Sequence, residues 1–317
     1  MTASLPAFTD YESFRPFRAD PAQWLPIARD IAHGHGLTCT EPQIFSTGTN
    51  LVVGLGETLI LKLFPPMLRG QFVSERNSLA QLHGRLGVPI PEIIFEGERD
   101  GWPYLAITRL PGVLGSEAWP TLSESEKERV LVEIGQTIAE VQRAPLGDLA
   151  NIEPRWGRFL SAQIAGCRAR HECLGLPRKF LDGLDELLRD AERLIPLDQP
   201  PVILTGEYIP ENFLLSRDRA GWRLSGLIDF GDVMTGWGEY DLLGPSAFMT
   251  AGMPRRVRSL FEGYGYSAAE ITPDLRRRLM ALMLLHRFGN PTRQICIEGW
   301  QQKAADLHEL QDLLWPI

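Results

Sequence analysis

Apolar and polar residues alternate between Glu41 and Phe64, and the segment is rich in β-branched side chains. This pattern predicts three strands, with a turn near residues 46–50 and a hairpin near residues 54–57. Two further strands are expected between residues 88 and 110, around a turn at residues 99–102. The first third of the chain is therefore expected to form a small antiparallel sheet.

Helical patterns surround and follow these strands. Residues 20–37 predict a helix with Asp20 as its N-cap, Pro21 in its first turn and a glycine-rich end at residues 33–36. Residues 71–86 predict an amphipathic helix that ends at Gly87. Beyond residues 110–112 the pattern is mainly helical, most clearly over residues 125–144 and 180–194 and in the tail from Pro254 onward. A small β element interrupts the helices at residues 203–232.

The predicted fold class is therefore α+β, with two lobes. Residues 1–110 would form a small N-terminal lobe of antiparallel strands, and residues 111–317 a larger helical C-terminal lobe. We expect a ligand to bind in the cleft between two such lobes, because clefts of this kind are common binding sites.

Composition narrows the range of partners. The chain has 317 residues and a net charge of −8, which argues against nucleic acid, since phosphate backbones are bound by clustered Lys and Arg. An acidic surface fits a cationic or neutral small substrate. No apolar run has transmembrane length and no signal pattern begins the sequence, so no membrane partner is expected. Four cysteines without metal-ligand spacing indicate reduced thiols and a cytoplasmic protein: Cys39, Cys167, Cys173 and Cys296.

Lys62 is the first candidate for chemistry, because it lies within the apolar strand LILKLF. Burial of a lysine is costly unless it is paired, and Glu75 on the following helix is the natural partner. Such a pair holds the α- and β-phosphates in nucleotide kinases. The alternative is a lysine on an edge strand that reaches solvent. The polar turn of Ser46, Thr47, Gly48 and Thr49 could place backbone N–H groups over phosphates, although a plain hairpin turn explains it equally well.

A second group of candidates lies in LTGEYIPENFLL and the later LIDFGD. Glu207 is a candidate base, and Asn212 and Asp229 offer the hard oxygen ligands that Mg²⁺ prefers. A base, an amide and a second carboxylate in this order indicate phosphoryl transfer to a hydroxyl group. The alternative is that Asn212 caps a turn and Asp229 caps the next segment.

These motifs resemble those of the aminoglycoside phosphotransferases, small-molecule kinases with a two-lobed protein-kinase-like fold. TGEYIPEN has the spacing of the family loop H-G-D-x-x-P-x-N throughout, and Asp229 matches the metal-binding Asp of the later I-D-F/W motif. The resemblance implies ATP (or GTP) and Mg²⁺ as cofactors. It also implies that Asp241 is a structural residue and that the backbone of Thr108 and Leu110 pairs with adenine.

Within that family the chain looks most similar to the bacterial hygromycin B kinases. The stretches that agree include WPYLAITRLPG, DFGDVMTGWGEYDL, the helix LLHRFG and a closing LLWP. The resemblance therefore implies a hygromycin B-type aminoglycoside as the acceptor and a role in antibiotic resistance. Polycationic substrates call for acidic and aromatic side chains, and four candidates in the C-terminal region are Trp237, Glu239, Glu298 and Trp300.

The loop departs from the family pattern at two positions. Thr205 stands where the family has His, and Glu207 stands where it has Asp. Glu can accept a proton as Asp does, but its extra methylene displaces the carboxylate by about 1 Å, which can cost ~10²-fold in rate. A longer Glu beside a shorter Thr could be a compensating pair. Two alternatives stay open: a kinase of another amino alcohol or sugar, and a nucleotide-binding pseudokinase with a regulatory role.

Overall fold

The computed structural model describes residues 4–37, 41–46 and 48–316. The chain forms two compact units. The first unit contains Met1–Gly84, Pro89–Pro111 and Ile228–Val233, and the second contains Arg85–Val88, Gly112–Leu227 and Met234–Ile317. Six residues that follow β9 therefore pack with the N-terminal sheet rather than with their neighbours in sequence. The proposed roles of residues 1–110 and 111–317 as nucleotide and substrate lobes stay predictions.

The first unit is built on a five-stranded antiparallel sheet in the order β1-β2-β3-β5-β4. Its strands are β1 (Pro42–Phe45), β2 (Leu51–Leu55), β3 (Leu59–Leu63), β4 (Ile93–Arg99) and β5 (Trp102–Thr108). The five predicted strands, three between residues 41 and 64 and two between residues 88 and 110, are confirmed. Asp100 and Gly101 both have positive φ, 52° and 81°, as a tight two-residue hairpin turn requires.

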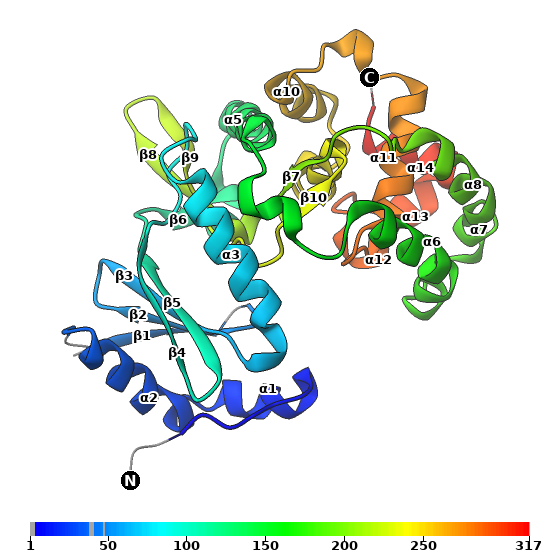
Figure 1. Cartoon of the computed structure of the whole chain (residues 1–317). Coiled ribbons are helices and arrows are strands. Elements are labelled where there is room, and N and C mark those ends of the chain that lie inside the picture. The colour runs from blue at the N-terminus through cyan, green and yellow to red at the C-terminus, as the bar shows by residue number, and fades with distance from the viewer. Residues whose placement is uncertain (1–3, 38–40, 47, 317) are drawn as a thin grey trace. The chain divides into compact units, whose positions relative to one another are not determined.

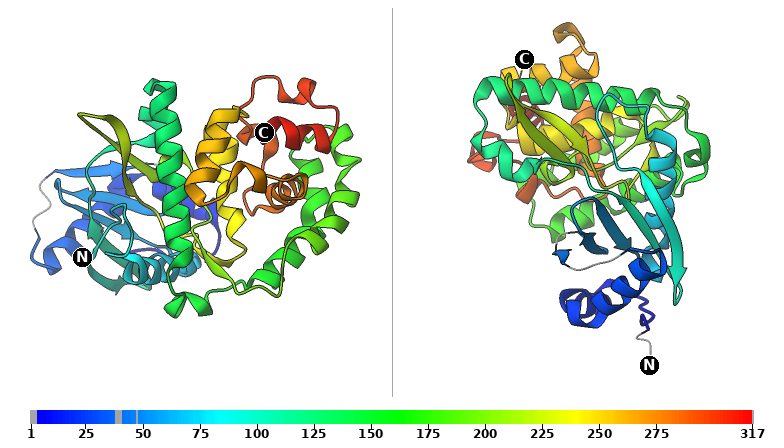
Figure 2. Two further views of the ribbon diagram at one scale, coloured as in Figure 1. Left: turned by 90° about the horizontal axis from the view of Figure 1, so that it is seen from above. Right: turned by 90° about the vertical axis from the view of Figure 1, so that its left-hand side faces the viewer.

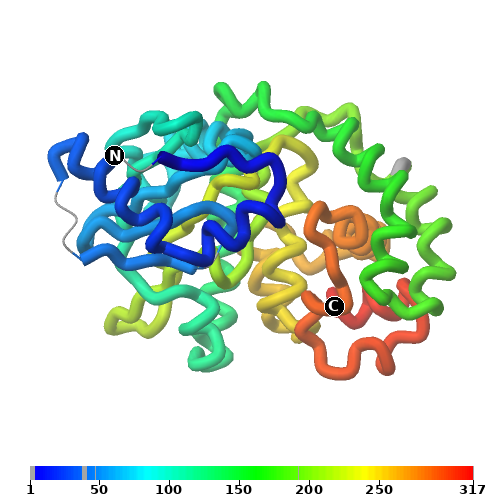
Figure 3. The backbone as a smooth tube through the Cα atoms, turned by 90° about the horizontal axis from the view of Figure 1, so that it is seen from below, coloured from blue at the N-terminus to red at the C-terminus, as the bar shows by residue number. Residues whose placement is uncertain are grey.

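Helices cover the sheet of the first unit: α1 (Tyr11–Ala19), α2 (Pro21–Gly34) and α3 (Arg69–Leu82). Phe14 of α1 and Trp24 of α2 pack in one apolar core with Leu61 and Leu63 of β3. Figures 1 and 3 show α1 and α2 lying together along the sheet. Since successive strand residues point to opposite faces, Lys62 points away from this core. The opposite face is where α3 brings Glu75.

One helix prediction for this unit needs correction, and one helix was not predicted. The helix expected to end at Gly87 ends at Leu82, and Gly84 follows with a φ of 72°, which stops helical geometry. No helix was predicted at α1, whose sequence YESFRPFRA has Pro16 inside. The Asp10 side chain caps this helix by accepting a bond from the Ser13 N–H at 2.8 Å. The predicted cap at Asp20 of α2 is confirmed.

The second unit combines short strands with helices (Figure 1). Its strands form a three-stranded sheet in the order β6-β8-β9 and a two-stranded sheet of β7 and β10. The bounds are β6 (Val113–Leu114), β7 (Val202–Leu204), β8 (Phe213–Asp218), β9 (Gly221–Leu227) and β10 (Met234–Gly236). The helices are α4 (Gly115–Ala118), α5 (Glu124–Arg143), α6 (Trp156–Cys173), α7 (Arg178–Leu181), α8 (Leu184–Leu194), α9 (Leu243–Pro245), α10 (Pro254–Tyr264), α11 (Pro273–Leu285), α12 (Pro291–Gln294), α13 (Trp300–Lys303) and α14 (Leu307–Leu314).

Helices α5 and α10 lie side by side in the second unit (Figures 1 and 2). Gly135 of α5 faces the backbone of α10, and Gly263 of α10 faces the Val132 carbonyl of α5, so a Cβ at either glycine would collide with main chain.

The single helix expected over residues 180–194 is divided into α7 and α8, with the break at Asp182 and Gly183. Within the described ranges, no helix is both long and apolar enough to cross a bilayer.

Candidate active site

Lys62 of β3 lies in a cluster with two carboxylates of the first unit. Its Nζ is 2.7 Å and 2.6 Å from the two oxygens of Glu75 on α3, and 3.2 Å from Oδ1 of Asp229. Glu75 is buried, whereas the Asp229 side chain is 40% exposed. The expected pairing of Lys62 with Glu75 is therefore present, and the alternative of a solvent-facing lysine is wrong.

Burial and the charges within this cluster shift the pKa values of all three groups. Burial alone would lower the pKa of Lys62, but the charges of Asp229 and Glu75 outweigh burial and raise it. Burial raises the pKa of Glu75 to about 7, and the Lys62 ammonium acts against this rise. Lys62 lowers the pKa of Asp229. With all three groups charged the cluster has a net charge of −1, which suits an additional cation.

The polar turn after β1 is tied to α3 through Gln71. The Gln71 Oε1 accepts bonds from the Thr49 hydroxyl at 3.2 Å and the Asn50 amide at 3.1 Å, while its Nε2 donates to Asp232 at 3.3 Å. Gly48 has a φ of 87° and the Ser46 carbonyl accepts a bond from Arg18. Thr47 lies outside the described residues, so the predicted phosphate contact of this turn stays a prediction.

Thr108 and Leu110 follow at the end of the same sheet. Thr108 ends β5, and both its N–H and its hydroxyl bond to the backbone of Glu92, at 2.9 Å each. Leu110 is the second residue beyond this strand, directly before Pro111. The placement is compatible with the adenine contact that the family resemblance implies, which stays a prediction.

The loop that contains Glu207 belongs to the second unit, and Asp241 holds its start. The Asp241 carboxylate accepts bonds from the Thr205 N–H at 3.0 Å and the Gly206 N–H at 2.9 Å. Burial raises the pKa of Asp241 to about 7, and the two N–H donors act against this rise. Asp241 therefore has the structural position that the resemblance implies.

Further bonds fix the loop after Glu207. The Glu207 carbonyl accepts bonds from the Ile209 N–H at 2.9 Å and from the Asn212 side-chain amide at 3.0 Å. Asn212 is buried, and its Nδ2 is committed to the loop, so Oδ1 is the amide atom that a metal ion would bind. The Glu207 side chain is half-buried. The backbone on both sides of this carboxylate is thus held by hydrogen bonds.

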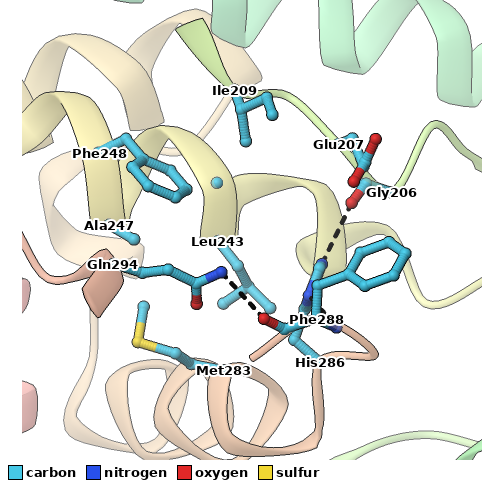
Figure 4. A pocket seen from close by; sticks show the side chains of 11 residues that line it. Gly206, Glu207, Ile209, Leu243, Ala247, Phe248, Met283, His286, Phe288 and Gln294 are labelled. Atoms are coloured by element: carbon cyan, nitrogen blue, oxygen red, sulfur yellow. Dashed lines mark hydrogen bonds between the residues drawn. The ribbon is translucent and has the colours of Figure 1, made fainter. Parts of the chain in front are cut away.

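A pocket of the second unit adjoins Glu207 (Figure 4). Six of its eleven lining residues have apolar side chains: Ile209, Leu243, Ala247, Phe248, Met283 and Phe288. The polar side chains of the lining are Glu207, His286 and Gln294, and Gly206 and Gly244 complete it. Glu207 is the single carboxylate among these lining residues, so this part of the site is apolar with one negative charge at its edge.

His286 contacts the loop from the end of α11. Its Nε2 is 3.1 Å from the Gly206 carbonyl oxygen (Figure 4). Its ring stacks on Tyr240 with centroids 4.5 Å apart. The sequence LLHRFG contains this residue, but neither spacing nor motif indicated its contact with a loop 80 residues earlier. The sequence gave no indication of a role for Gln71 either, because His286 and Gln71 both form hydrogen bonds with residues far away in the chain.

The two predicted Mg²⁺ ligands, Asn212 and Asp229, lie in different units. Among residues 4–37, 41–46 and 48–316 there is no cluster of three or more His, Cys, Asp or Glu side chains suited to a metal ion. A magnesium site made by Asn212 and Asp229 stays a prediction. The residue types fit it, because Mg²⁺ commonly takes one or two protein oxygens together with phosphate oxygens and water.

The four C-terminal candidates for substrate contact do not line the pocket beside Glu207. Glu239 is buried and accepts bonds from Arg278 at 2.7 Å and from the Tyr266 hydroxyl at 2.8 Å, so it forms part of the core. Trp300 is buried against Phe180. The acidic and aromatic pattern reflected internal ion pairing and packing at these two positions. Trp237 is half-buried and Glu298 is exposed.

The cysteines are a separate matter. Cys167, Cys173 and Cys296 are free thiols, and Cys39 lies outside the described residues.

Solved structures of other proteins share the fold of this chain. The alignment with the GDP complex of an aminoglycoside 2'-phosphotransferase-IIIa covers 91% of this chain and 95% of that chain. Its TM-score is 0.67, and the two sequences are 16% identical. The alignment with a macrolide 2'-phosphotransferase from Brachybacterium faecium covers 93% of this chain and 98% of that chain, with a TM-score of 0.57 and 19% identity. The predicted kinase-like fold, with an antiparallel sheet and a larger helical part, is confirmed.

Sequence comparison gives the family. Residues 45–281 match the phosphotransferase enzyme family, and the chain belongs to it. An aminoglycoside 3'-phosphotransferase from Streptomyces fradiae is 30% identical over 166 residues, which cover 50% of this chain and 57% of the relative. An aminoglycoside 3'-phosphotransferase from Streptomyces ribosidificus is 32% identical over 157 residues, which cover 46% of this chain and 54% of the relative. The chain thus spans slightly more than half the length of these curated relatives.

Proposed function

We propose that the protein transfers the γ-phosphoryl group of ATP (or GTP) to a hydroxyl group of a small molecule, with Mg²⁺. Lys62, positioned by Glu75, binds the nucleotide phosphates. Asn212 and Asp229 bind the metal ion, and Glu207 accepts the proton of the attacking hydroxyl.

The observation that carries the proposal is the cluster of Lys62 with Glu75 and Asp229. With all three groups ionised, the Lys62 ammonium and its two carboxylates have one negative charge in excess, and the carboxylate that reaches solvent is that of Asp229. Mg²⁺ binding at Asp229 would balance this excess. It would also leave Lys62 to donate to phosphate oxygens while Glu75 keeps it in place.

The acceptor that we propose first is an aminoglycoside of the hygromycin B type. The motifs quoted above support it, and the curated relatives from two Streptomyces species are named as aminoglycoside 3'-phosphotransferases. The net charge of −8 also favours a cationic molecule over an anionic one.

The pocket beside Glu207 favours a second candidate class of acceptor. A polycation is bound best by several carboxylates, but Glu207 is the single carboxylate among the lining residues, and six side chains are apolar. This lining suits a molecule that presents an apolar face beside its reactive hydroxyl group and has few positive charges there.

Release of ADP from Mg²⁺-ATP tests the proposal and separates the acceptors. The panel contains hygromycin B, kanamycin, a macrolide and small amino alcohols, each with the wild type and with Glu207→Gln. We expect acceptor-dependent release that Glu207→Gln abolishes. Turnover of aminoglycosides alone supports the first class, and turnover of the macrolide alone supports the second. Mg²⁺-dependent ATP binding without release for any acceptor would contradict phosphoryl transfer and favour a pseudokinase.

A further inference from the structure

The peptide bond between Gly206 and Glu207 is held at its carbonyl end by a side chain from outside the loop. His286 Nε2 lies 3.1 Å from the Gly206 oxygen, and the Gly206 N–H donates to Asp241 at 2.9 Å. Gly206 has a φ of 76°, a conformation that glycine adopts at little cost. Both polar backbone groups of the residue before the proposed base are therefore fixed, each by a different side chain.

The hydrogen bonds of His286 define its tautomer. The backbone N–H of Phe288 donates to Nδ1 at 3.2 Å, so Nδ1 has no proton and Nε2 carries it. Nε2 is then the donor to the Gly206 carbonyl. Burial lowers the pKa of His286 to about 3, so the ring is neutral at physiological pH. A neutral ring with a fixed tautomer is a directional donor for one backbone oxygen.

Neighbouring groups hold the ring in place. Its face stacks on Tyr240 with an interplanar angle of 16°. Gln294 closes the turn that supplies the Phe288 N–H. Its Nε2 donates to the Phe288 carbonyl at 2.9 Å (Figure 4), and its Oε1 accepts from the Asn290 N–H at 2.7 Å. His286 is thus oriented from its face and from its Nδ1 edge before it reaches the loop.

The loop's own side chain at the preceding position does not supply such a contact. The Thr205 hydroxyl is buried and interacts with the Tyr208 hydroxyl rather than with the Gly206 carbonyl. We propose that His286 is a positioning residue for Glu207: its Nε2–H fixes the plane of the Gly206–Glu207 peptide and thereby aims the carboxylate. This inference rests on the proposed role of Glu207 as the base.

The first experiment measures loop order without reference to activity. Hydrogen–deuterium exchange would follow the peptide covering residues 203–213 in the wild type, His286→Ala and His286→Gln. Loss of one hydrogen bond is expected to speed exchange of the Thr205 and Gly206 amides about fivefold in His286→Ala. His286→Gln retains a side-chain N–H donor and should show a smaller increase.

His171 provides a matched control for the same helix. The His171 Nε2 is 2.8 Å from the carbonyl oxygen of Leu284, which lies on α11 two residues before His286. Among the bonds of the described residues, none joins His171 to the loop of Glu207. His171→Ala should lower the melting temperature but leave exchange of the loop unchanged. Equal exchange of the loop in wild type and His286→Ala would overturn the proposal, as would equal effects of His171→Ala and His286→Ala.

The second experiment tests whether the contact acts through Glu207. With an acceptor from the panel, His286→Ala should lower kcat by about 10- to 100-fold, since misplacement by about 1 Å has effects of this size, while KM for ATP stays unchanged. In a Glu207→Gln background the same substitution should change the residual rate by less than about twofold. A full-sized loss in that background would show that His286 acts elsewhere and would overturn the proposal.

The two experiments also separate this inference from the proposed function. Faster loop exchange in His286→Ala together with no turnover of any acceptor would count against phosphoryl transfer while supporting the positioning of the loop by His286. Turnover that depends on Glu207 but not on His286 would support the proposed function and reject the inference.

Discussion

The Lys62 ammonium lies 2.6 Å from a Glu75 carboxylate oxygen, and both side chains are buried in the first unit. A buried ion pair is strongly destabilised when one partner is removed, because the other must stay charged without compensation or change its protonation state. Lys62→Ala is therefore expected to lower the free energy of unfolding by ~3–5 kcal/mol. Urea denaturation of the full chain measures this change.

The exposed pair of Arg69 and Glu98 in the same unit is the control. Its N–O distance is 2.7 Å, but both side chains are about half exposed. Arg69→Ala should cost less than ~1 kcal/mol, since solvent screens such pairs. A loss for Lys62→Ala no larger than that for Arg69→Ala would contradict a buried pair.

Asp241 predicts opposite effects of pH on stability and on activity. Burial raises its pKa from an ordinary value of 3.8 to about 7, so the folded state binds the proton more tightly than the unfolded state. The stabilising contribution is complete below about pH 4 and is lost as the pH rises through about 7. The ionised carboxylate, however, is the better acceptor for the Thr205 and Gly206 N–H groups.

We therefore expect ionisation of Asp241 to lower the melting temperature and to raise kcat between about pH 6 and pH 8. Melting curves and initial rates over this range measure the two slopes. In Asp241→Asn both slopes should flatten, because the amide does not ionise. Identical slopes in the wild type and in this variant would show that other groups determine the pH dependence.

Glu207→Asp should lower kcat rather than restore the usual form of the loop. The backbone on both sides of Glu207 is held by bonds to His286, Ile209 and Asn212, so a shorter side chain cannot be compensated by a shift of the loop. Withdrawal of the carboxylate by about 1 Å is expected to cost up to ~10²-fold. Steady-state kinetics with an accepted substrate measures the loss. Glu211→Asp, at an exposed position of the same loop, is the matched control and should leave kcat unchanged.

Gly244 allows the loop that contains Glu207 to approach α9. A Cβ at this position would collide with the Tyr208 carbonyl oxygen, one residue after Glu207. Gly244→Ala should cost ~1–3 kcal/mol of stability by overpacking and should lower kcat by displacing the loop. At Gly166 of α6 a Cβ would meet no atom within 4 Å, so Gly166→Ala should be neutral or should stabilise by up to ~1 kcal/mol. Thermal melts and kinetics of the two variants, compared directly, test whether the close approach at Gly244 matters.

Apolar and β-branched residues between Pro42 and Leu63 predicted strands there, and a lysine inside the last strand pointed to a partner such as Glu75 because burial of an unpaired charge is costly. Helix α1 was not predicted, because residues such as Phe14 are buried only against the sheet and α2. His286 and Gln71 could not be assigned roles, since their partners are set by tertiary packing. Glu239 is an acidic residue of the kind expected in a binding site, but it is buried and its ion pair with Arg278 gives it an internal role.

The return of Ile228–Val233 to the first unit determines how the chain can be divided. This short segment supplies Asp229 to Lys62, and the Val233 carbonyl accepts a bond from the Ser74 hydroxyl of α3 at 2.9 Å. A fragment that stops at Pro111 would lack both contacts. A chimaera that exchanges N-terminal lobes between relatives must therefore transplant two separate stretches of sequence. Recombination at a single crossover would pair Lys62 and Ser74 of one parent with the returning segment of the other.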